Sequence, residues 1–406
     1  MNRKLLQVNV TANWGSTGRI AEEIGVAAIN AGWESYVAYG RNPRQSRSNL
    51  VKIGSERDIL WHVFQTRFFD RQGLASKSAT KQFVKWIEQM KPDIVHLHNI
   101  HGYYVNYPIL FTCLKELKTP VVWTLHDCWP FTGHCSHFMS INCMKWTTQC
   151  EHCELKRKYP GSLLFDRSYK NYIDKKKYFT SLSDVTLVPV SKWLNGLLDK
   201  SFLKCYETYT IHNGTDINVF RPEINETIYD LYHIDNKNFV IGVASVWDKY
   251  KGLDDFFKLR DALPNNLSMV LVGLTEKQMC SLPKGIIGIM RTENVEQLRN
   301  LYSMADAFVN PTYEDNFPTT NIEALACGTP VITYDTGGSP EAVDKSTGFV
   351  VDKGDIAGIV DAIGAIKERG RDYWRKACRH RAEQCFNKDR QYEQYIELYD
   401  RILSRK

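Results

Sequence analysis

The sequence predicts an α/β protein with two doubly wound parallel sheets, and three observations support that class. The chain has 406 residues, more than a single hydrophobic core accommodates, so two domains are expected. Short runs rich in β-branched residues alternate with longer amphipathic stretches, the pattern of parallel strands joined by crossover helices. After a segment that contains proline and asparagine, this alternation begins afresh near Phe239.

The expected elements follow in order along each half. In the first half we expect a helix at 17–32 and strands at 4–10, 35–40, 93–98, 121–127, 186–191 and 209–214. Residues 213–225, NGTDINVFRPEIN, are typical of a linker. In the second half we expect strands at 238–245, 267–273, 285–290, 307–311 and 330–335. The last stretch, 390–406, has aromatic and aliphatic residues at helical spacing and should pack on another element.

These elements predict an N-terminal domain over 1–218, a C-terminal domain over 219–386 and a helix over 387–406 that packs back on the N-terminal domain. Ligands of doubly wound sheets bind beyond the carboxyl ends of the strands, so we expect a ligand there, in the crevice between the two domains.

Composition narrows the class of protein. Hydrophobic residues make up 43% of the chain and charged residues 24%, as in ordinary globular enzymes. The apolar run after the basic N-terminal tip is too short for a signal peptide, and no stretch is long enough to span a membrane. We therefore expect a cytoplasmic protein whose eleven cysteines do not form disulfides. The formal charge of +6 suits an anionic ligand or an anionic membrane surface and is too small to imply nucleic acid.

Glycines follow the first expected strand, in NWGSTGR at 13–19. Gly15 and Gly18 would let the backbone approach a ligand, and the N-terminus of the following helix favours anions. The alternative is a turn that only tightens the packing of strand and helix. The spacing also departs from the triple-glycine fingerprint of dinucleotide-binding folds.

Histidines gather at the ends of two other expected strands. His126 and Asp127 end the apolar strand of WTLHD, and His98, Asn99 and His101 follow the strand of DIVHLHNIHGYY. Neutral imidazole offers both a donor and an acceptor to sugar hydroxyls. We predict that His98, Asn99, His101 and Asp127 line an acceptor site; the alternative is that the histidines bond loop carbonyls.

The second half supplies groups suited to a diphosphate. Lys249 and Lys251 precede Gly252 and a helix, where an ammonium group can stabilise a leaving phosphate. Pro318 suits a first helical position, and the amides of Thr319 and Thr320 would form an anion cradle. Glu323 lies further along that helix, where its carboxylate could accept both hydroxyls of a ribose.

These residues belong to one uninterrupted run, YEDNFPTTNIEALACGTPVITYDTGGSPE, at 313–341. The run resembles the E-x7-E element, the EAxAxGxPV segment and the GGxPE turn of the retaining glycosyltransferase family 4. NGTD at 213–216, TLHD and the N-terminal glycine loop fall in the family's order, so the resemblance covers essentially the whole chain. It implies the α/β fold called GT-B, in which two Rossmann-like domains face a central cleft.

By that resemblance Glu323 binds the nucleotide ribose, Lys251 the diphosphate and His126 the transferred sugar. Asp315 aligns with the first acid of the pair but has a shorter side chain than the usual glutamate. We predict catalytic roles for His126, Asp315 and Lys251. The predicted donor-binding set is Gly15, Gly18, Lys249, Lys251, Asn316, Phe317, Thr319, Thr320 and Glu323.

Two residues depart from the family's pattern. Pro318 stands where the family usually has glycine. Val246 stands where many members carry the arginine that partners the lysine, and Lys249 or Arg19 could replace that arginine.

The resemblance implies a retaining hexosyltransferase that moves a sugar from a nucleotide diphosphate to a hydroxyl of a glycan, and this glycan is expected to be carried on a lipid diphosphate. The process it implies is surface polysaccharide biosynthesis, such as that of O-antigen, colanic acid or lipopolysaccharide. The departing diphosphate can accept the proton of the incoming hydroxyl, so no cofactor or catalytic metal is expected. One alternative is a nucleotide-sugar epimerase of the same fold, and another is an inactive, zinc-stapled nucleotide-binding protein. A nicotinamide dehydrogenase is disfavoured because the first turn lacks the fingerprint glycines.

Five cysteines crowd the insert at 128–153, and the last two form a CxxC pair. Cys135, Cys143, Cys150 and Cys153 are the expected ligands of a structural zinc ion, with His134, His137 or His152 as possible replacements for one of them. Free thiols and a redox pair are the alternatives. The insert resembles the GHC…C…W…C..C segment of glycosyltransferases that build colanic acid and O-antigen.

Two segments interleave aromatic residues with lysine and arginine at helical spacing, 59–73 and 165–179. Such faces can lie on an anionic bilayer, which would place the protein at the cytoplasmic face of the membrane, near a lipid-linked acceptor. In the alternative arrangement, each helix packs its aromatic residues inward and exposes only its basic face.

Overall fold

The computed structural model describes residues 3–235 and 237–405. The chain divides into two compact units, each described here by itself. Unit 1 comprises Met1–His212 and Gln391–Lys406, and unit 2 comprises Asn213–Arg390. The division in the chain falls shortly before the boundary predicted at residue 218.

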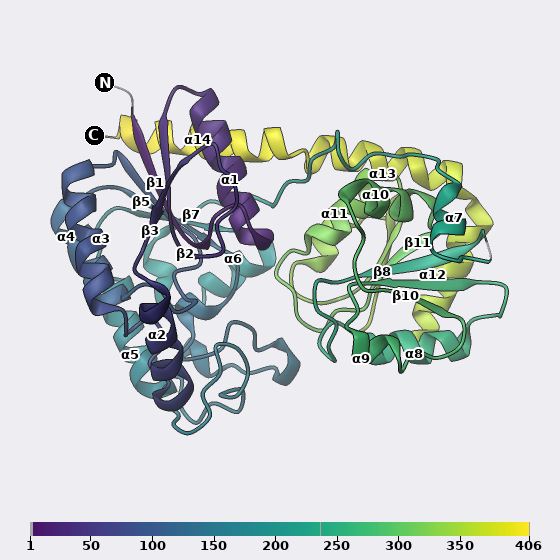
Figure 1. The fold of residues 1–406 in the computed structure, drawn as a ribbon, viewed down its shortest axis with the longest axis horizontal. Helices are drawn as coiled ribbons and strands as arrows, with labels where there is room; N and C mark the ends of the chain where they lie inside the picture. The colour runs from purple at the N-terminus through teal and green to yellow at the C-terminus, as the bar shows by residue number, and fades with distance from the viewer. Residues whose placement is uncertain (1–2, 236, 406) are drawn as a thin grey trace. The chain divides into compact units, whose positions relative to one another are not determined.

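Unit 1 contains a seven-stranded sheet in the order β3-β2-β1-β4-β5-β6-β7, and every pairing in it is parallel. Its strands are β1 Lys4–Thr11, β2 Glu34–Arg41, β3 Asn49–Lys52, β4 Ile94–Leu97, β5 Val121–Leu125, β6 Val185–Pro189 and β7 Glu207–Thr208. Its helices are α1 Gly15–Asn30, α2 Glu56–Phe69, α3 Lys77–Met90, α4 Tyr107–Leu117, α5 Ser168–Phe179 and α6 Lys192–Leu198. Helix α1 lies on one face of the sheet, while α3, α4 and α5 lie on the other (Figure 1).

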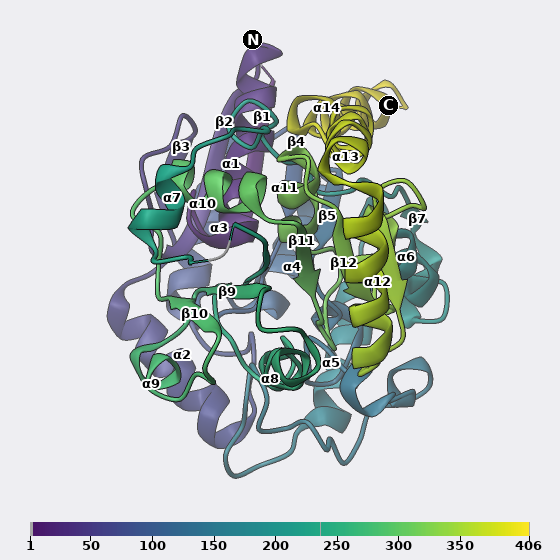
Figure 2. The same ribbon diagram turned by 90° about the vertical axis from the view of Figure 1, so that its right-hand side faces the viewer.

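Unit 2 contains a six-stranded parallel sheet in the order β10-β9-β8-β11-β12-β13. Its strands are β8 Phe239–Val243, β9 Ser268–Val272, β10 Ile286–Ile289, β11 Ala307–Asn310, β12 Val331–Tyr334 and β13 Gly348–Val351. Its helices are α7 Thr227–Leu231, α8 Leu253–Ala262, α9 Glu276–Met279, α10 Val295–Met304, α11 Thr319–Ala326, α12 Ile356–Arg369 and α13 Arg371–Cys385. Helices α8 and α9 lie on one face of the sheet and α10 and α11 on the other (Figures 1 and 2). The predicted class of two doubly wound parallel sheets is confirmed.

Helix starts follow local side-chain chemistry. Ser55 and Asp58 form a capping box at the start of α2, and Asn106, Ser191 and Asn294 accept backbone N–H groups at the starts of α4, α6 and α10. These contacts replace hydrogen bonds that the first turn of a helix lacks, typically with a gain of about 1 kcal/mol each.

One expected strand differs in the structure. The segment 209–214 was predicted as a strand, but β7 ends at Thr208. Tyr209 N–H still donates to Leu187 O at 2.9 Å and Ile211 N–H to Pro189 O at 3.3 Å. Pro189 has no N–H to return, so the ladder loses a bond and the regular strand stops.

The last helix, α14, covers Lys388–Ser404 and passes from unit 2 into unit 1. Its apolar side chains belong to the unit 1 core together with residues of α1 and of strands β1, β4, β5 and β6. The α14 members are Tyr392, Tyr395, Ile396, Leu398, Tyr399 and Ile402. Burying each such side chain stabilises the fold by about 1.5–3 kcal/mol before entropic costs, so α14 is an integral part of unit 1.

Candidate functional site

Each sheet has one place where the strand order reverses. In unit 1 it lies between β1 and β4, and in unit 2 between β8 and β11. Loops that follow such strands diverge and leave room for a ligand at the carboxyl edge. Most of the predicted site residues lie on the loops after these four strands or after β5.

In unit 2, Gly252 brings the loop after β8 against the loop after β11. Gly252 has a φ of +76°, and a Cβ atom there would lie 2.2 Å from Pro311 O. Tyr313 N–H also donates to Tyr250 O at 2.8 Å, which joins the two loops. Only glycine combines this backbone conformation with so close an approach.

This approach brings two predicted catalytic side chains together. Lys251 Nζ lies 2.6 Å from Asp315 Oδ2, and both side chains are partly exposed. Lys251 N–H donates to Asp248 Oδ1 at 2.9 Å, which fixes the start of its side chain. An ammonium group held in this way can contribute positive charge to an anion at the carboxyl edge of the sheet.

The start of α11 lies beside this ion pair in the chain. Pro318, predicted as the first helical residue, is the N-cap instead: its ψ of 121° is extended, and the helix begins at Thr319 without a side-chain cap. The first amides of a helix have no intrahelical acceptor, so this end favours an anion. Asn316 and Phe317 are buried, and Asn213 Nδ2–H donates to Phe317 O at 3.2 Å.

Glu323 lies one turn into α11 and is half-buried. Tyr302 OH donates to Glu323 Oε2 at 3.4 Å from the fully buried end of α10. On the same helix, the buried Asn321 joins α11 to β11 and to the turn at Ser339–Ala342. Its Oδ1 accepts from Asn310 Nδ2 at 2.8 Å, and its Nδ2 donates to Ser339 Oγ at 3.1 Å. Sequence reasoning missed Tyr302 and Asn321, although an asparagine inside an apolar helix face is a detectable signal.

Val246 was named as a departure from the family's pattern, and Lys249 and Arg19 as substitutes for the missing arginine. Val246 is exposed. The Lys249 ammonium lies 5.0 Å from the centre of the Tyr250 ring. In unit 1, Arg19 Nε donates to Gly15 O at 3.3 Å at the surface. No described contact joins Lys249 to Lys251, so the replacement of the missing arginine stays a prediction.

In unit 1, the glycine loop after β1 is tied to β1 itself. Thr11 Oγ1 donates to Trp14 O at 2.7 Å, and a Cβ atom at Gly18 would lie 2.6 Å from Thr11 Oγ1. Gly18 is therefore needed for packing of α1 on β1. Gly15 has a φ of +68° and open space around it, so its conformation, rather than crowding, favours glycine there.

The histidines predicted at the ends of β4 and β5 form a ladder inside unit 1. His96 and His98 share a face, as predicted, and their ring centroids lie 4.1 Å apart. His98 Nδ1 lies 3.1 Å from His126 Nε2, and His98 Nε2 lies 3.0 Å from Gln7 Oε1. Burial holds the pKa of His98 well below the usual range and lowers that of His126 to about 4. These rings are therefore neutral near pH 7, and His126 is the partly exposed member.

Two residues of α14 anchor this ladder from the opposite side. Tyr399 OH lies 2.6 Å from His96 Nδ1, and Thr124 Oγ1 lies 2.7 Å from His96 Nε2 and 3.1 Å from Tyr395 OH. Neither tyrosine was singled out from the sequence.

The remaining predicted acceptor residues lie next to the ladder. His101 Nε2 lies 2.7 Å from Asp127 Oδ2, and both side chains are buried. Burial would raise the pKa of Asp127, but His101 and the Trp129 N–H lower it to about 2. Asn99 is half-buried, and its carbonyl accepts from Tyr104 OH at 2.9 Å. Of the four residues predicted to contact an acceptor, only Asn99 is partly exposed, and the contacts themselves stay predictions.

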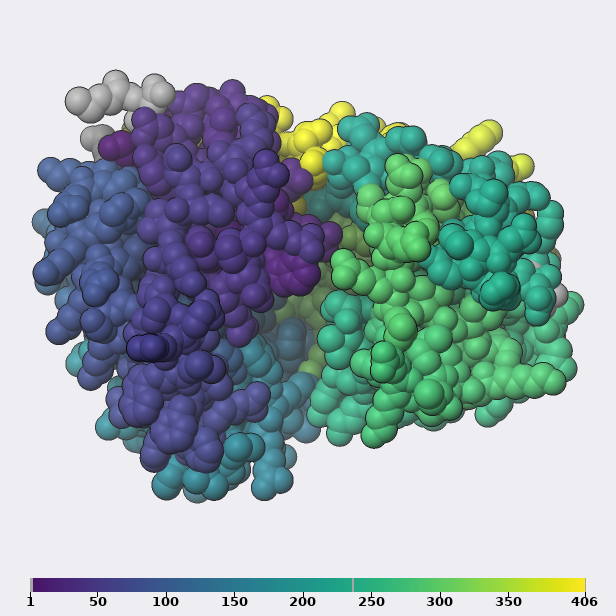
Figure 3. Space-filling model, viewed as in Figure 1, coloured from purple at the N-terminus to yellow at the C-terminus, as the bar shows by residue number. Residues whose placement is uncertain are grey.

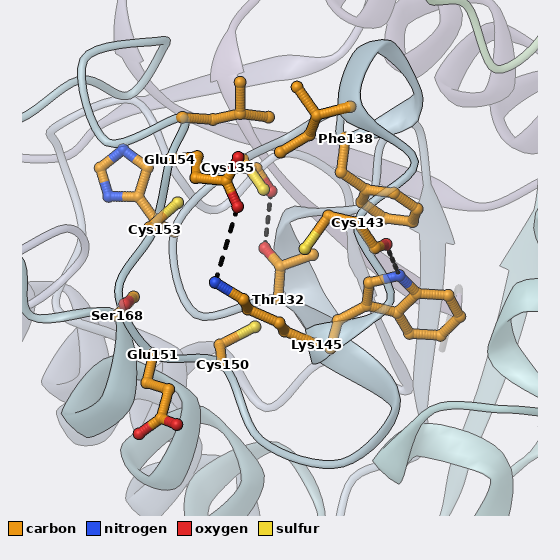
Figure 4. Close-up of a pocket in the computed structure, with 14 residues that line it drawn as sticks. Thr132, Cys135, Phe138, Cys143, Lys145, Cys150, Glu151, Cys153, Glu154 and Ser168 are labelled. Carbon is orange, nitrogen blue, oxygen red and sulfur yellow. Dashed lines mark hydrogen bonds and ion pairs between the residues drawn. The ribbon is translucent and has the colours of Figure 1, made fainter.

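The cysteine insert folds as short 3-10 turns around aromatic residues. Cys135, Cys143, Cys150 and Cys153 line one cavity of about 20 Å³ together with His134 (Figure 4). The Cys135 thiol donates a hydrogen bond to Cys153, which lowers the pKa of Cys153 to about 7. Within residues 3–235 and 237–405, no three histidine, cysteine or acidic side chains are arranged to hold a metal ion. The structural zinc ion therefore stays a prediction from the sequence.

The two basic aromatic segments behave differently. In α5, Tyr172 and Phe179 are buried, but Tyr169 and Ile173 are exposed and Lys175 is buried, so this segment fits neither arrangement in full. In α2, the side chains of Leu60, Trp61, Phe64 and Phe69 are exposed instead. Together with exposed Leu163, Leu164 and Phe165 they form what we call the aromatic strip of unit 1. Helix α2, dark purple in Figure 3, lies on the visible face of this unit.

Contacts between rings make the strip continuous. Ring centroids lie 5.4 Å apart for Trp61 and Phe64, 6.0 Å for Phe64 and Phe69, and 5.8 Å for Phe69 and Phe165. The Arg67 carbonyl accepts from Leu163 N–H at 2.7 Å, which joins α2 to the leucines, and the Lys156 ammonium donates to Leu164 O at 3.4 Å.

Comparison with known proteins supplies the remaining findings. The family model described as Glycosyltransferase Family 4 matches residues 17–219, half of the chain, and the one described as Glycosyl transferases group 1 matches residues 226–384. The chain is 22% identical over 388 residues to the putative colanic acid biosynthesis glycosyl transferase WcaC of Escherichia coli K12, covering 88% of this chain and 89% of that protein. It is 27% identical over 203 residues to the capsular polysaccharide biosynthesis glycosyltransferase CapM of Staphylococcus aureus, covering 47% of this chain and 53% of that protein.

Solved structures share the fold at low identity. Sucrose-phosphate synthase from Thermosynechococcus elongatus superposes with a TM-score of 0.73 at 17% identity, with both chains fully covered. HepE from Anabaena, solved in complex with UDP, superposes with a TM-score of 0.68 at 14% identity, covering 98% of this chain and 99% of that one.

Proposed function

The chain belongs to glycosyltransferase family 4, and from that premise we propose that it is a retaining enzyme that transfers a hexosyl group from a nucleotide-diphosphate sugar to a hydroxyl of a glycan. The observation that carries this proposal is the pairing of Lys251 with Asp315 beside the uncapped start of α11 in unit 2. An ammonium group paired with Asp315, four residues before a helix start without a side-chain cap, suits a diphosphate. Glu323, one turn along the same helix, suits the ribose hydroxyls.

The chemistry follows from charge. When the bond between the sugar and the diphosphate breaks, negative charge grows on the leaving oxygen, and Lys251 with the α11 amides stabilises it. The same phosphate oxygen takes the proton of the incoming hydroxyl as the new glycosidic bond forms on the same face of the sugar. The reaction therefore needs no attacking carboxylate and no metal ion. We assign His126 to a hydroxyl of the transferred sugar.

The similarity to WcaC and CapM supports surface polysaccharide biosynthesis as the process that this transfer serves. We propose a lipid-linked glycan as the acceptor. No helix among the described residues has the length and apolarity to cross a bilayer. The aromatic strip supports contact with the membrane surface, because exposed aromatic rings near the Lys156 ammonium suit the headgroup region of an anionic bilayer.

A panel of nucleotide sugars tests the activity directly. Purified protein is incubated with each donor, with and without a membrane extract of lipid-linked glycans, and released nucleoside diphosphate is measured. Acceptor-dependent release supports the transferase. Release without an acceptor, or interconversion of the donor sugar, identifies an epimerase, and absence of release with every donor identifies an inactive binding protein.

Sedimentation with vesicles tests the membrane contact. Vesicles of phosphatidylglycerol and phosphatidylethanolamine should retain the protein, and Trp61→Ser with Phe64→Ser should reduce the bound fraction by at least about tenfold. Tyr373→Ser, an exposed aromatic residue of α13 in unit 2, is the matched control and should bind normally. Equal binding of both variants would exclude the strip as the contact.

A further inference from the structure

Gln7 is a buried amide in the middle of β1, where its neighbours in the sequence are apolar. Its Nε2–H donates to Ala21 O of α1 at 2.8 Å. A backbone carbonyl can only accept, so this bond decides which end of the amide is the nitrogen. The other end, Oε1, must therefore face His98 Nε2, 3.0 Å away.

The orientation of Gln7 fixes the proton on His98. An amide oxygen cannot donate, so the hydrogen of this bond lies on His98 Nε2. The His98 ring is buried, stacked on His96 and joined edge to edge with the nearly parallel His126 ring. An enclosed imidazole beside two other imidazoles is neutral, since burial and any neighbouring positive charge both disfavour the charged form. His98 Nδ1 therefore carries a lone pair and can only accept.

The same logic passes to the next ring. His98 Nδ1 lies 3.1 Å from His126 Nε2. Since His98 Nδ1 accepts, His126 Nε2 must carry the hydrogen. In neutral imidazole only one nitrogen is protonated, so Nδ1 is the acceptor atom of His126.

We propose that Gln7 and His98 are positioning residues that hold His126 in its Nε2–H tautomer, so that Nδ1 accepts a hydrogen bond from a sugar hydroxyl. This inference rests on the proposed function for the identity of the ligand. The ladder is closed at its far end by Tyr399 and Thr124, which hold His96 under the His98 ring. Asp127, bonded to His101, is the nearest acidic neighbour of His126 in the sequence.

If His126 Nδ1 can only accept, the site should prefer a donor sugar that has a hydroxyl at this position. A ligand hydroxyl must donate to His126 Nδ1, so an analogue without that hydroxyl leaves a partner unbonded. A wild-type enzyme should discriminate against the deoxy donor that lacks it by about tenfold in kcat/KM. If the tautomer were free to change, this discrimination would weaken.

The tautomer can be read without any substrate. In protein labelled with ¹⁵N-histidine, long-range ¹⁵N–¹H spectra distinguish a protonated from an unprotonated ring nitrogen, and His126→Gln identifies the His126 signals. At pH 7 the wild-type protein should show His126 protonated at Nε2 alone. Gln7→Met removes the acceptor at His98 and should give a mixture of His126 tautomers. Gln7→Glu places a carboxylate there, which favours a doubly protonated His98, so His126 should become protonated at Nδ1 instead.

The control is Gln72→Met, which removes another buried glutamine of unit 1 that bonds Asp70 and Trp129 rather than the ladder. It should leave the His126 signals unchanged. An unchanged His126 tautomer in both Gln7 variants would overturn the proposal, as would an Nδ1-protonated His126 in the wild-type protein. Because the spectra need neither donor nor acceptor, these outcomes are separate from failure of the transferase assay. In that assay Gln7→Met should lose about tenfold in kcat/KM with the full donor and nothing with the relevant deoxy donor.

Discussion

At the scale of single residues, the ion pair of Lys251 and Asp315 is the feature on which the donor site depends. Its two members lie far apart in the sequence but on loops after neighbouring strands, β8 and β11. The pair is partly exposed, so its own contribution to stability is small. Its value lies in holding an ammonium group where an anion would bind.

We expect Lys251→Met to lower kcat by about 10²–10³-fold, because one charged group that stabilises the leaving diphosphate is lost. Steady-state kinetics with saturating donor would measure this. Lys258→Met, which removes a surface lysine of α8 paired with Asp255, is the matched control and should change kcat less than twofold. A Lys251→Met enzyme with the wild-type kcat would contradict the assigned role.

Gly252 allows a prediction about stability. Alanine there would meet Pro311 O and adopt a left-handed backbone, so Gly252→Ala should destabilise unit 2 by about 1–3 kcal/mol. Gly364→Ala lies in α12 of the same unit with open space around it and should stabilise by about 0.5–1 kcal/mol. Urea unfolding of both variants gives the two free energies, and equal values would disprove the argument.

Site residues could be predicted from the sequence where they belong to a recognisable motif. Lys251, Asp315, Glu323 and His126 were named before the structure, and it brings the first two into contact. Gln7, Tyr302 and Tyr399 were not, because their partners come from distant segments and no local pattern marks the contact. The local signs of buried polar contacts were a glutamine within an apolar strand in unit 1 and, in unit 2, the asparagine at 321 within an apolar helix face.

At the scale of elements, α14 supports the histidine ladder from behind, although none of the predicted site residues lies on this helix. Its side chains Tyr395 and Tyr399 reach the histidine ladder, while its apolar face completes the core of unit 1. The spacing of aromatic residues predicted a packed helix, but spacing alone cannot say which polar groups the tyrosine hydroxyls meet.

We expect Tyr399→Phe to destabilise unit 1 by about 1–3 kcal/mol, because the buried His96 Nδ1 would lose its hydrogen-bond partner. Tyr373→Phe removes a hydroxyl from an exposed tyrosine of α13 and should cost less than about 0.5 kcal/mol. Chemical denaturation measures both. If the two variants lost the same free energy, the bond to His96 would have no net stabilising effect.

The cysteine insert carries the one prediction about a metal. If it binds zinc as the sequence predicts, elemental analysis should find one zinc ion per chain, and a chelator should lower Tm. Cys150→Ser with Cys153→Ser should abolish the zinc, whereas Cys205→Ser, an exposed cysteine outside the insert, should keep it. Metal-free wild-type protein with an unchanged Tm would leave the insert stabilised by its aromatic residues and hydrogen bonds alone.

At the scale of the whole molecule, the sequence predicted the class of both sheets but not all of their strands. The rhythm of strands and helices predicted two doubly wound domains, yet the edge strands β3 and β13 were missed. Strand β3, NLVK, is mostly exposed and has only two apolar residues, so its sequence resembles a loop.

Buried histidines give unit 1 a predicted sensitivity to acid. Burial lowers the pKa of His62 to about 3 and of His126 to about 4, and holds those of His96 and His98 well below the usual range. The unfolded chain binds these protons near pH 6.5 while the folded chain does not, so stability falls as the pH drops below 6.5. Each histidine contributes up to about 1.4 kcal/mol per pH unit. His134 affects stability in the opposite direction. Burial lowers its pKa, but the hydrogen bond and charge of Asp70 outweigh burial, so the folded-state pKa is raised. The stability that this histidine contributes is therefore kept in acid and lost as the pH rises.

Hydrogen exchange between pH 7.5 and 5 would test this. Amides of unit 1 should lose protection before those of unit 2, and His62→Gln should reduce the pH dependence of unfolding by about one proton. His62 accepts from Gly73 N–H and contacts Ser76, so the variant also lowers stability at pH 7.5; the slope is the informative quantity. An unchanged slope would contradict the assignment of a neutral buried His62.

The chain's last helix has a consequence for how the protein is made. The ribosome finishes all of residues 213–390 before it releases Tyr392, Tyr395 and Tyr399, which the first-synthesised sheet needs for its core. The half that emerges first is thus the half that matures last, and until α14 emerges the apolar core residues that this helix covers stay uncovered.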